Sequence, residues 1–440
     1  MLFGKIKGVH TPHRKSTAKS ESVAMPCPGC VSIPMSMHIG APATPIVKVG
    51  DRVLVGQKIA EAGGFVSSPV HASVSGTVKK IEGMLISNGQ TVDSIIIESD
   101  GEMTPYAEKK EIELSDFDSF ISAVRESGVV GLGGAGFPTA VKLGVKDLAK
   151  LEHIVVNCAE CEPYITSDTR TMLERGDDIL YGVELFKKFL SAKSIVFGVE
   201  SNKGECIKAL KELFGDDPSV RVDSLPASYP QGAEKVLTYN TTGKIIEEGK
   251  LPFDAGVIVI NVTTLCAVAS YIKTGMPLVS KCVTVDGSAV KEPKNVIAPI
   301  GTPIKDLIDF CGGYKSEPKK ILYGGPMMGI AVYSDESPVL KNTNAILAFD
   351  GADATPPKTT ACIRCGNCVN HCPMRLDPPA ISKAFKQKDA DTLQKLKVNL
   401  CMECGACVFA CPAARPIVHN HKLAKVFLRE EQNKRKESAK

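Results

Sequence analysis

Eight of the sixteen cysteines form two runs with one spacing, and thiolates in this pattern can hold [4Fe–4S] clusters. Each run reads Cys-x-x-Cys-x-x-Cys-x-x-x-Cys-Pro, and the runs begin at Cys362 and Cys401. Three thiolates spaced by two residues come from one tight loop, so they can bind three irons of one cubane. The fourth cysteine precedes proline and enters a helix that points toward the other cluster. We therefore assign one cluster to Cys362, Cys365, Cys368 and Cys411, and the other to Cys401, Cys404, Cys407 and Cys372.

The residues around these runs fit a cluster-binding domain. Gly366 and Gly405 let the backbone approach the cluster sulfurs closely and aim N–H groups at them. A zinc site would need two pairs of ligands, not two quartets with trailing prolines, which argues against zinc. Residues 379–398 are predicted to form a helical insert between the runs, and the polar, proline-rich residues 350–360 a linker before them.

A second chemical signal is the glycine-rich loop GLGGAG at residues 131–136. Helical periodicity is predicted before it, over 117–127, and again after it. Clustered glycines expose backbone N–H groups to an anion at a helix N-terminus, although no strand leads into this loop as the dinucleotide-binding fingerprint requires. The strand predicted at 153–157 ends in Asn157, and Glu160 and Glu162 follow it. Strand ends of this kind bind ligands in α/β sheets, and the alternative for both glutamates is a solvated loop.

Four segments carry a family resemblance. GLGGAGFPTAVK and VVNCAECEP resemble the flavin-binding region of the complex I flavoprotein subunit and, more closely, the RnfC component of the Rnf electron transport complex. Two later segments match in order: YPQGAE at 229–234 and VINVTT at 259–264. The resemblance implies a multidomain α/β and α+β fold. Its parts are an N-terminal barrel-sandwich (lipoyl-like) domain at 1–105, a Rossmann-like FMN/NADH domain at 115–255, a β-grasp domain at 256–349 and a helical two-cluster ferredoxin-type domain with a basic tail at 355–440.

The resemblance also implies the site residues. The loop glycines that would cradle the FMN phosphate and ribityl chain are Gly131, Gly133, Gly134 and Gly136. The side chains that would complete the FMN site are Lys142, Asn157, Glu160, Tyr229, Asn261 and Thr264. Phe137 would stack on the nicotinamide nucleotide, and Glu162 and Glu234 would face its adenine or ribose side. Leu132 stands where the complex I flavoprotein has a basic residue, so the electrostatics around the flavin are expected to differ.

The N-terminal and third domains carry weaker signals. Residues 46–83 resemble the barrel-sandwich of lipoyl and biotinyl carriers, but their hairpin reads SSPVH at 67–71 and lacks the lysine that carriers modify. We expect a scaffold or docking module, with His71 as a structural hydrogen-bonding residue. Cys27 and Cys30 are either two tolerated small residues in a loop or a redox pair or extra metal half-site. Residues 281–313 alternate as in the small β-grasp domain of this family, and 324–329 are predicted to be a packing turn.

Composition bounds the remaining possibilities. The chain of 440 residues predicts about three domains, and its net charge of +4 is too small to argue for nucleic acid. Residues 255–272 are predicted to form a buried strand–helix pair rather than a membrane span. No segment resembles a secretory signal, and the cysteine pattern indicates a reducing compartment. Basic residues near the two ends are predicted to be solvated rather than to bind an acidic partner or membrane: His10, His13, Arg14, Lys15 and Lys19, and Arg429, Lys434, Arg435, Lys436 and Lys440.

These observations predict an electron-transferring oxidoreductase subunit. A nicotinamide gives two electrons as hydride and a cluster accepts one, so a flavin is the expected converter, and no catalytic acid or base is required. By resemblance, the chain is a peripheral subunit on the cytoplasmic face of the membrane that passes electrons between NAD(H), FMN, two clusters and ferredoxin-type partners. Integral membrane partners would couple that flow to Na⁺ or H⁺ translocation. The alternatives are a soluble relative that feeds proline reductase or cobalamin reductase, a relay scaffold without flavin, and a nucleic-acid enzyme with a structural cluster.

Overall fold

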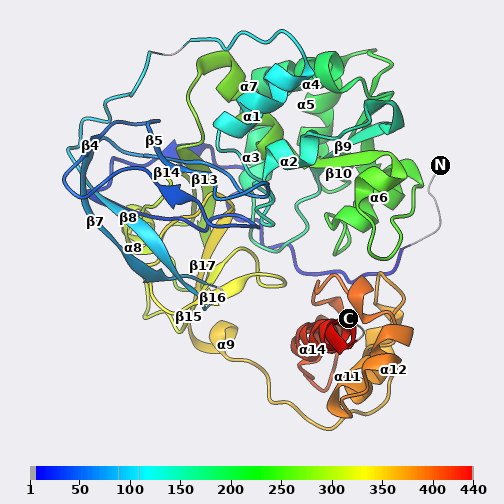
Figure 1. The fold of residues 1–440 in the computed structure, drawn as a ribbon. Helices are drawn as coiled ribbons and strands as arrows, with labels where there is room; N and C mark the ends of the chain where they lie inside the picture. Colours follow the sequence, from blue (N-terminus) through cyan, green and yellow to red (C-terminus); the bar gives the residue numbers. More distant parts are fainter. Residues whose placement is uncertain (1–5, 88, 109, 439–440) are drawn as a thin grey trace.

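The computed structural model describes residues 6–87, 89–108 and 110–438, which form four units (Figure 1). The first is the predicted barrel-sandwich, whose two small sheets enclose an apolar core that includes Val31, Ile59 and Ile95. One sheet, in the order β2-β8-β7-β4, contains β2 (Cys30–Pro34), β4 (Arg52–Val53), β7 (Gly76–Leu85) and β8 (Thr91–Ser99). The other contains β3 (Thr44–Pro45), β5 (Lys58–Glu61) and β6 (Val70–His71).

The second unit is a parallel sheet in the order β11-β10-β9-β12, covered by helices on both faces. Its strands are β9 (His153–Cys158), β10 (Ser194–Glu200), β11 (Val220–Leu225) and β12 (Val257–Asn261). Its helices are α1 (Phe117–Glu126), α2 (Thr139–Leu143), α3 (Ser167–Glu174), α4 (Gly176–Leu190), α5 (Gly204–Phe214), α6 (Glu234–Thr242) and α7 (Val262–Thr274). Ile154 and Val156 face the core of α1, α4 and α7, whereas Val155 faces α6. The strands are therefore apolar on both faces, as buried parallel strands are.

The structure corrects two predicted domain boundaries. Residues 256–274 do not begin the third domain, because Val257–Asn261 pairs in parallel with His153–Asn157 of the parallel sheet in the second unit. A strand as apolar as VIVI requires cover on both faces, and this sheet provides it. Residues 22–24 do not belong to the barrel-sandwich either. They form β1 (Ser22–Ala24), which pairs with β14 (Lys294–Pro299) of the third unit.

The third unit is a mixed sheet in the order β1-β14-β13-β17-β15-β16, with α8 (Ile304–Phe310) packed on it. Its further strands are β13 (Ser280–Asp286), β15 (Lys320–Tyr323), β16 (Ile330–Val332) and β17 (Ala345–Phe349). The alternating segment at 281–313, expected to belong to the small β-grasp domain, forms β13, β14 and α8. A short helix, α9 (Gly351–Ala354), and exposed residues without regular structure then lead to the fourth unit.

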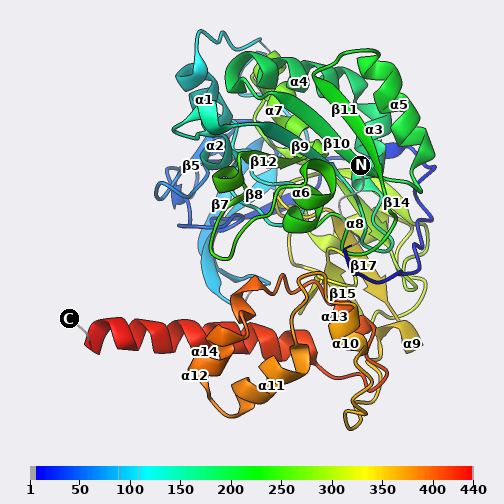
Figure 2. The ribbon, with the colours of Figure 1, turned by 90° about the vertical axis from the view of Figure 1, so that its right-hand side faces the viewer.

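The fourth unit is helical and lies below the other three (Figure 2). It contains α10 (Asn367–Asn370), α11 (Pro378–Lys386), α12 (Ala390–Lys395), α13 (Ala406–Phe409) and α14 (Ile417–Ser438). The predicted insert is helical, but it is divided into α11 and α12 around Lys388, which has a φ of 56°. Among the helices that the structure describes, none has the length and apolar composition needed to cross a membrane.

We call the second unit, with the parallel sheet, the flavin-type unit, and the fourth, helical unit the cluster-type unit. The segment before β1 runs between these two units (Figure 1). Val9 and Tyr229 exchange two backbone hydrogen bonds of 2.8 Å each. The ammonium of Lys15 donates to the carbonyls of Glu160 (2.8 Å), Glu162 (2.7 Å) and Ile165 (2.5 Å), and burial lowers its pKa to about 8. The prediction of a solvated basic end is therefore wrong for Lys15, while Lys440 lies outside the described residues.

Candidate functional site

A cleft of about 600 Å³ lies at the carboxyl edge of the parallel sheet, where the flavin-type, third and cluster-type units meet. A volume of this size is typical of small-molecule and cofactor sites. Eight predicted site residues line it: Gly133, Gly134, Asn157, Glu160, Glu162, Tyr229, Glu234 and Asn261. Five others are not among the described residues that line it: Gly131, Gly136, Phe137, Lys142 and Thr264.

The glycine-rich loop presents its backbone to this cleft. The amide of Gly131 donates to the Phe137 carbonyl (2.8 Å) and that of Gly136 to the Gly131 carbonyl (3.1 Å), which closes the loop. Gly134 has a φ of 115° that side-chain-bearing residues rarely adopt. A Cβ on Gly133 would lie 3.1 Å from Nδ2 of Asn261. Gly133, Gly134 and Ala135 line the cleft with mostly backbone atoms, and a wall of this kind fits a phosphate group.

Two asparagines stand side by side where β9 and β12 end, since Asn157 and Asn261 are paired in register. Asn157 donates to the Gly232 carbonyl (2.9 Å). Asn261 caps α7 by accepting from the Thr264 amide (3.2 Å), and it donates to Asp168 (2.7 Å). Thr264 in turn accepts from the Leu132 amide (2.9 Å), so it supports the glycine-rich loop from behind rather than lining the cleft.

Asp168 also lines the cleft, and the sequence did not indicate it. Its other oxygen accepts from the Thr263 hydroxyl (2.6 Å). Burial raises the pKa of Asp168, and the nearby Glu160 raises it further. No local pattern marks this aspartate, because it lies in the first turn of a helix that contacts the cleft only through the fold.

Glu160 is buried, and both of its carboxylate oxygens have partners. One accepts from the Asp168 amide (2.7 Å), and the other from the Thr169 hydroxyl (2.7 Å) and the Lys203 ammonium (3.2 Å). Burial lowers the pKa of Lys203, but the carboxylates of Glu160 and Glu200 outweigh it, so the pKa is raised. Glu160 therefore forms part of the inner wall of the cleft.

Glu162 joins the cleft to the third unit. Its carboxylate accepts from the amides of Met327 (3.0 Å) and Met328 (2.9 Å), and burial raises its pKa. The turn at 324–329, predicted to serve packing, thus also lines the cleft through Gly324, Gly325, Met328 and Gly329. Glu234, which also lines the cleft, forms an ion pair with Lys142 (2.9 Å), and Lys142 also donates to the Val259 carbonyl (3.0 Å).

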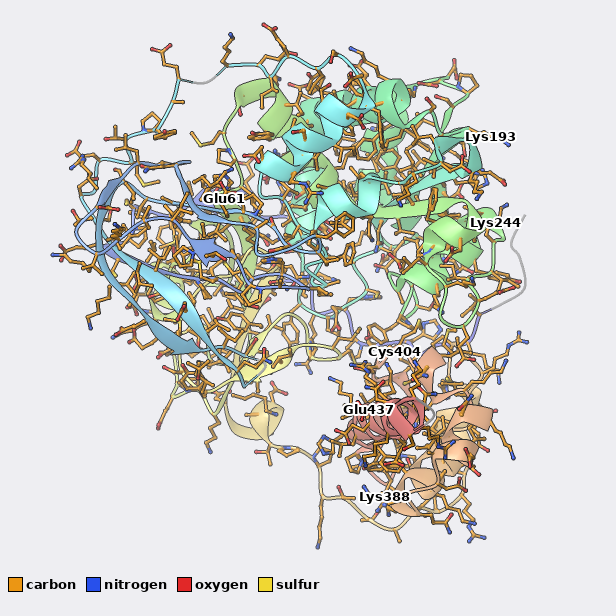
Figure 3. The ribbon with its side chains drawn as sticks, viewed as in Figure 1. Glu61, Lys193, Lys244, Lys388, Cys404 and Glu437 are labelled. Carbon is orange, nitrogen blue, oxygen red and sulfur yellow. The ribbon has the colours of Figure 1, made fainter. Side chains whose placement is uncertain are left out.

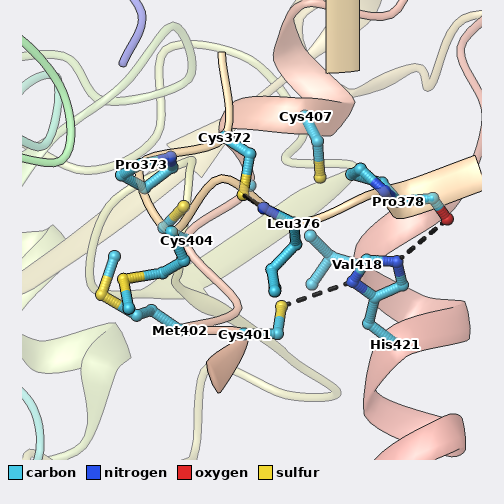
Figure 4. Close-up of a pocket in the computed structure, with 12 residues that line it drawn as sticks. Cys372, Pro373, Leu376, Pro378, Cys401, Met402, Cys404, Cys407, Val418 and His421 are labelled. Atoms are coloured by element: carbon cyan, nitrogen blue, oxygen red, sulfur yellow. Dashed lines mark hydrogen bonds between the residues drawn. The ribbon is translucent and has the colours of Figure 1, made fainter. Parts of the chain in front are cut away.

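The cysteines assigned to the second cluster surround one small cavity (Figure 4). Its thiols belong to Cys372, Cys401, Cys404 and Cys407. The Leu376 amide donates to Sγ of Cys372 (3.4 Å), and Nδ1 of His421 lies 3.4 Å from Sγ of Cys401. Three thiols from one loop and one from the other run meet around a largely apolar cavity, which fits the donor set of a [4Fe–4S] cluster.

The remaining four cysteines lie nearer the surface. Cys362 and Cys365 are exposed, and Cys368 and Cys411 are half-buried. Burial raises the pKa of the Cys368 thiol, and the neighbouring thiols of Cys411 and Cys362 raise it further. Cys368 therefore lies near both Cys411 and Cys362, and the assignment of these four cysteines to one cluster stays a prediction.

The second cysteine loop is also a wall of the cleft. Cys404 lines both the small cavity and the cleft, and it lies on the face of the cluster-type unit that meets the rest of the molecule (Figure 3). The hydroxyl of the buried Tyr229 donates to the Cys404 carbonyl (2.5 Å). A Cβ on Gly405 would lie 2.9 Å from the Met327 carbonyl. The cleft and the buried cysteine cavity are thus in direct contact.

Four family models match successive parts of the chain. They are the RnfC barrel sandwich hybrid domain at 4–102, the Nuo51 FMN-binding domain at 124–270, the SLBB domain at 282–331 and the 4Fe-4S dicluster domain at 357–418. The RnfC component of the Na(+)-translocating ferredoxin:NAD(+) oxidoreductase complex of Acetobacterium woodii is 43% identical over 86% of this chain and 86% of its own. The chain belongs to the RnfC family.

Other RnfC relatives match over similar lengths. The corresponding component of the proton-translocating ferredoxin:NAD(+) oxidoreductase complex of Clostridium ljungdahlii is 41% identical over 89% of this chain and 86% of its own. That of the ion-translocating oxidoreductase complex of Rhodobacter capsulatus is 39% identical over 97% of this chain and 84% of its own. The similarity to RnfC proteins therefore extends over nearly the whole of this chain.

Proposed function

We propose that this RnfC protein is the peripheral electron-transfer subunit of a membrane-bound ferredoxin:NAD oxidoreductase. It passes electrons between NAD(H), FMN and two [4Fe–4S] clusters, and partner proteins of the complex couple that flow to Na⁺ or H⁺ translocation. It lies at the cytoplasmic face of the membrane against integral membrane and ferredoxin-type subunits. The observation that carries the proposal is that one cleft has the glycine-rich loop as one wall and the Cys404 loop as another.

The residues of the cleft have separate tasks in this function. The glycine-rich loop binds the FMN phosphate and ribityl chain. Asn157 and Asn261 complete the FMN site at the strand ends, where they hold the Gly232 carbonyl and the Asp168 carboxylate. When bound, FMN accepts a hydride and releases electrons singly. Tyr229 keeps the Cys404 loop against the cleft, and the surrounding units exclude water from that contact. Glu162 and Glu234, which both line the cleft, are the proposed contacts of the nicotinamide nucleotide.

The two clusters follow in a fixed order. Cys372, Cys401, Cys404 and Cys407 hold the cluster next to the cleft, because Cys404 lines both cavities. Cys362, Cys365, Cys368 and Cys411 hold the outer cluster, and the exposure of Cys362 and Cys365 makes it the exit toward a partner. Electrons therefore pass between this protein and its redox partner at the first cysteine run, not the second.

Two matched variants test this order. Anaerobically purified Cys372→Ala and Cys411→Ala should each fall from about eight irons to about four, since each removes one ligand of one cubane. NADH should bleach the flavin in both. The remaining cluster should then be reduced in Cys411→Ala but not in Cys372→Ala, as followed by electron paramagnetic resonance. The opposite result would refute the order, and an unmodified protein that holds no FMN would refute the function.

A further inference from the structure

The third unit makes three side-chain hydrogen bonds to the backbone of the glycine-rich loop and its leading residues. The Lys281 ammonium donates to the Leu132 carbonyl (3.0 Å). The Lys341 ammonium donates to the Gly128 carbonyl (2.7 Å). The Asn342 amide donates to the Gly134 carbonyl (2.8 Å). Donors from one unit thus fix three carbonyls along seven residues of another.

Both lysines are buried, with 3% exposure for Lys281 and 1% for Lys341. Burial lowers the pKa of both side chains, that of Lys341 to about 7. Taking an ammonium group out of water is costly, and replacing buried charges with apolar residues of similar size is often neutral or stabilising. A contribution to stability therefore does not explain why these two lysines are buried.

The hydrogen bond that Lys281 makes to the loop backbone suggests another role for this lysine. A hydrogen bond to the Leu132 carbonyl fixes the peptide plane that also carries the Gly133 amide, and Gly133 lines the cleft. The bond from Lys281 therefore acts on a part of the loop that lines the cleft.

Lys341 also connects the loop to the N-terminal unit. It donates to the Pro69 carbonyl (2.6 Å) and to the Ser68 hydroxyl (3.3 Å). These residues belong to the buried hairpin at 67–71 of the N-terminal unit. Lys341 thus joins this hairpin to Gly128, in the segment that leads into the glycine-rich loop.

We propose that Lys281 and Lys341 are positioning residues for the FMN phosphate, which makes the third unit an integral part of the flavin site. Lys281 fixes the Leu132 carbonyl within the glycine-rich loop, and Lys341 fixes the Gly128 carbonyl, three residues before the loop. This inference rests on the proposed function, since it takes the loop as the phosphate site. It predicts that the lysines affect binding of the phosphate and not of the isoalloxazine ring.

The test compares FMN with riboflavin, which has the same ring and no phosphate. Flavin-free full-length protein is titrated with each flavin, and binding is followed by flavin fluorescence. Lys281→Met and Lys341→Met should raise the Kd for FMN about tenfold or more, the size expected for a lost charged hydrogen bond. The Kd for riboflavin should change less than about twofold. Lys305→Met, an exposed lysine on α8 of the same unit, should change neither Kd.

The possible results distinguish a failure of this inference from a failure of the proposed function. An equal loss of FMN and riboflavin binding would mean that the lysines only maintain the fold, and unchanged binding of both would mean that they do not support the loop; either overturns the inference. If the lysine variants do not fold, Asn342→Ala removes the third donor without exposing a buried charge and should show the same preference in its loss. An unmodified protein that binds neither flavin would refute the proposed function itself.

Discussion

Replacing Lys203 with methionine should strongly destabilise the flavin-type unit. Lys203 and Glu160 form a buried ion pair (3.2 Å) in which the side chains are only 7% and 4% exposed. Removing one partner of a buried pair costs about 3–5 kcal/mol, because the other charge stays buried without compensation. Glu160 keeps its hydrogen bonds to Asp168 and Thr169, so we expect a value near the lower limit, about 3 kcal/mol.

The assay is anaerobic thermal unfolding of the complete chain, followed by circular dichroism. For a cooperative unit of about 150–250 residues, a loss of about 3 kcal/mol lowers the melting temperature by about 6–12 °C. Lys208→Met is the matched control, since Lys208 is on the adjoining helix and forms an exposed pair with Glu212 (3.8 Å). It should cost about 0.5 kcal/mol or less.

A double variant isolates the pair. Glu160→Gln removes the uncompensated charge, so the combination of Lys203→Met and Glu160→Gln should recover about 2 kcal/mol relative to Lys203→Met alone. If Lys203→Met melts within about 2 °C of the unmodified protein, or the double variant recovers nothing, then Glu160 is not held as described. A Glu160→Gln variant that loses flavin without any loss of stability would instead make Glu160 primarily a flavin ligand.

Three further variants test other contacts. Tyr229→Phe leaves the buried Cys404 carbonyl without its donor, so it should lower the unfolding free energy by about 1–2 kcal/mol and slow flavin-to-cluster transfer in stopped-flow experiments. Burial lowers the pKa of His71 to about 3, so below pH 6.5 the unfolded state binds more protons than the folded state. The free energy of unfolding therefore falls with acidification by up to about 1.4 kcal/mol per pH unit. His71→Gln should remove that part of the decline in melting temperature between pH 7 and 5. Gly325→Ala places a Cβ against the carboxylate of Glu162, so the NADH concentration for half-bleaching of the flavin should rise severalfold.

The features that the sequence could predict depend on short-range spacing. The strand–helix pair at 255–272 is confirmed by β12 and α7, because an apolar β-branched run followed by a helical pattern is a local signal. The helices that flank the glycine-rich loop are confirmed for the same reason. The meeting of Cys372 with Cys401, Cys404 and Cys407 agrees with the run spacing, although the pairing of the runs as cluster ligands stays a prediction.

What the sequence could not predict depends on contacts between distant residues. Lys15 reads as one of several basic residues near the start of the chain, yet its partners lie about 150 residues away. Lys281 and Lys341 occur in ordinary polar contexts, and nothing in their neighbourhood marks them as buried beneath the glycine-rich loop. The boundary after residue 255 failed because the fourth strand of the parallel sheet follows a long crossover, and its pairing with β9 is visible only in the fold.

The support of the glycine-rich loop by the third unit has a consequence for synthesis on the ribosome. A nascent chain that has emerged through residue 279 contains every strand of the parallel sheet but neither Lys281 nor Lys341. Domains fold as they emerge, so this sheet can form early while its phosphate loop still lacks support. We therefore expect flavin capture to wait until residues 341–344 are free, and the Cys404 wall to close the cleft only afterwards.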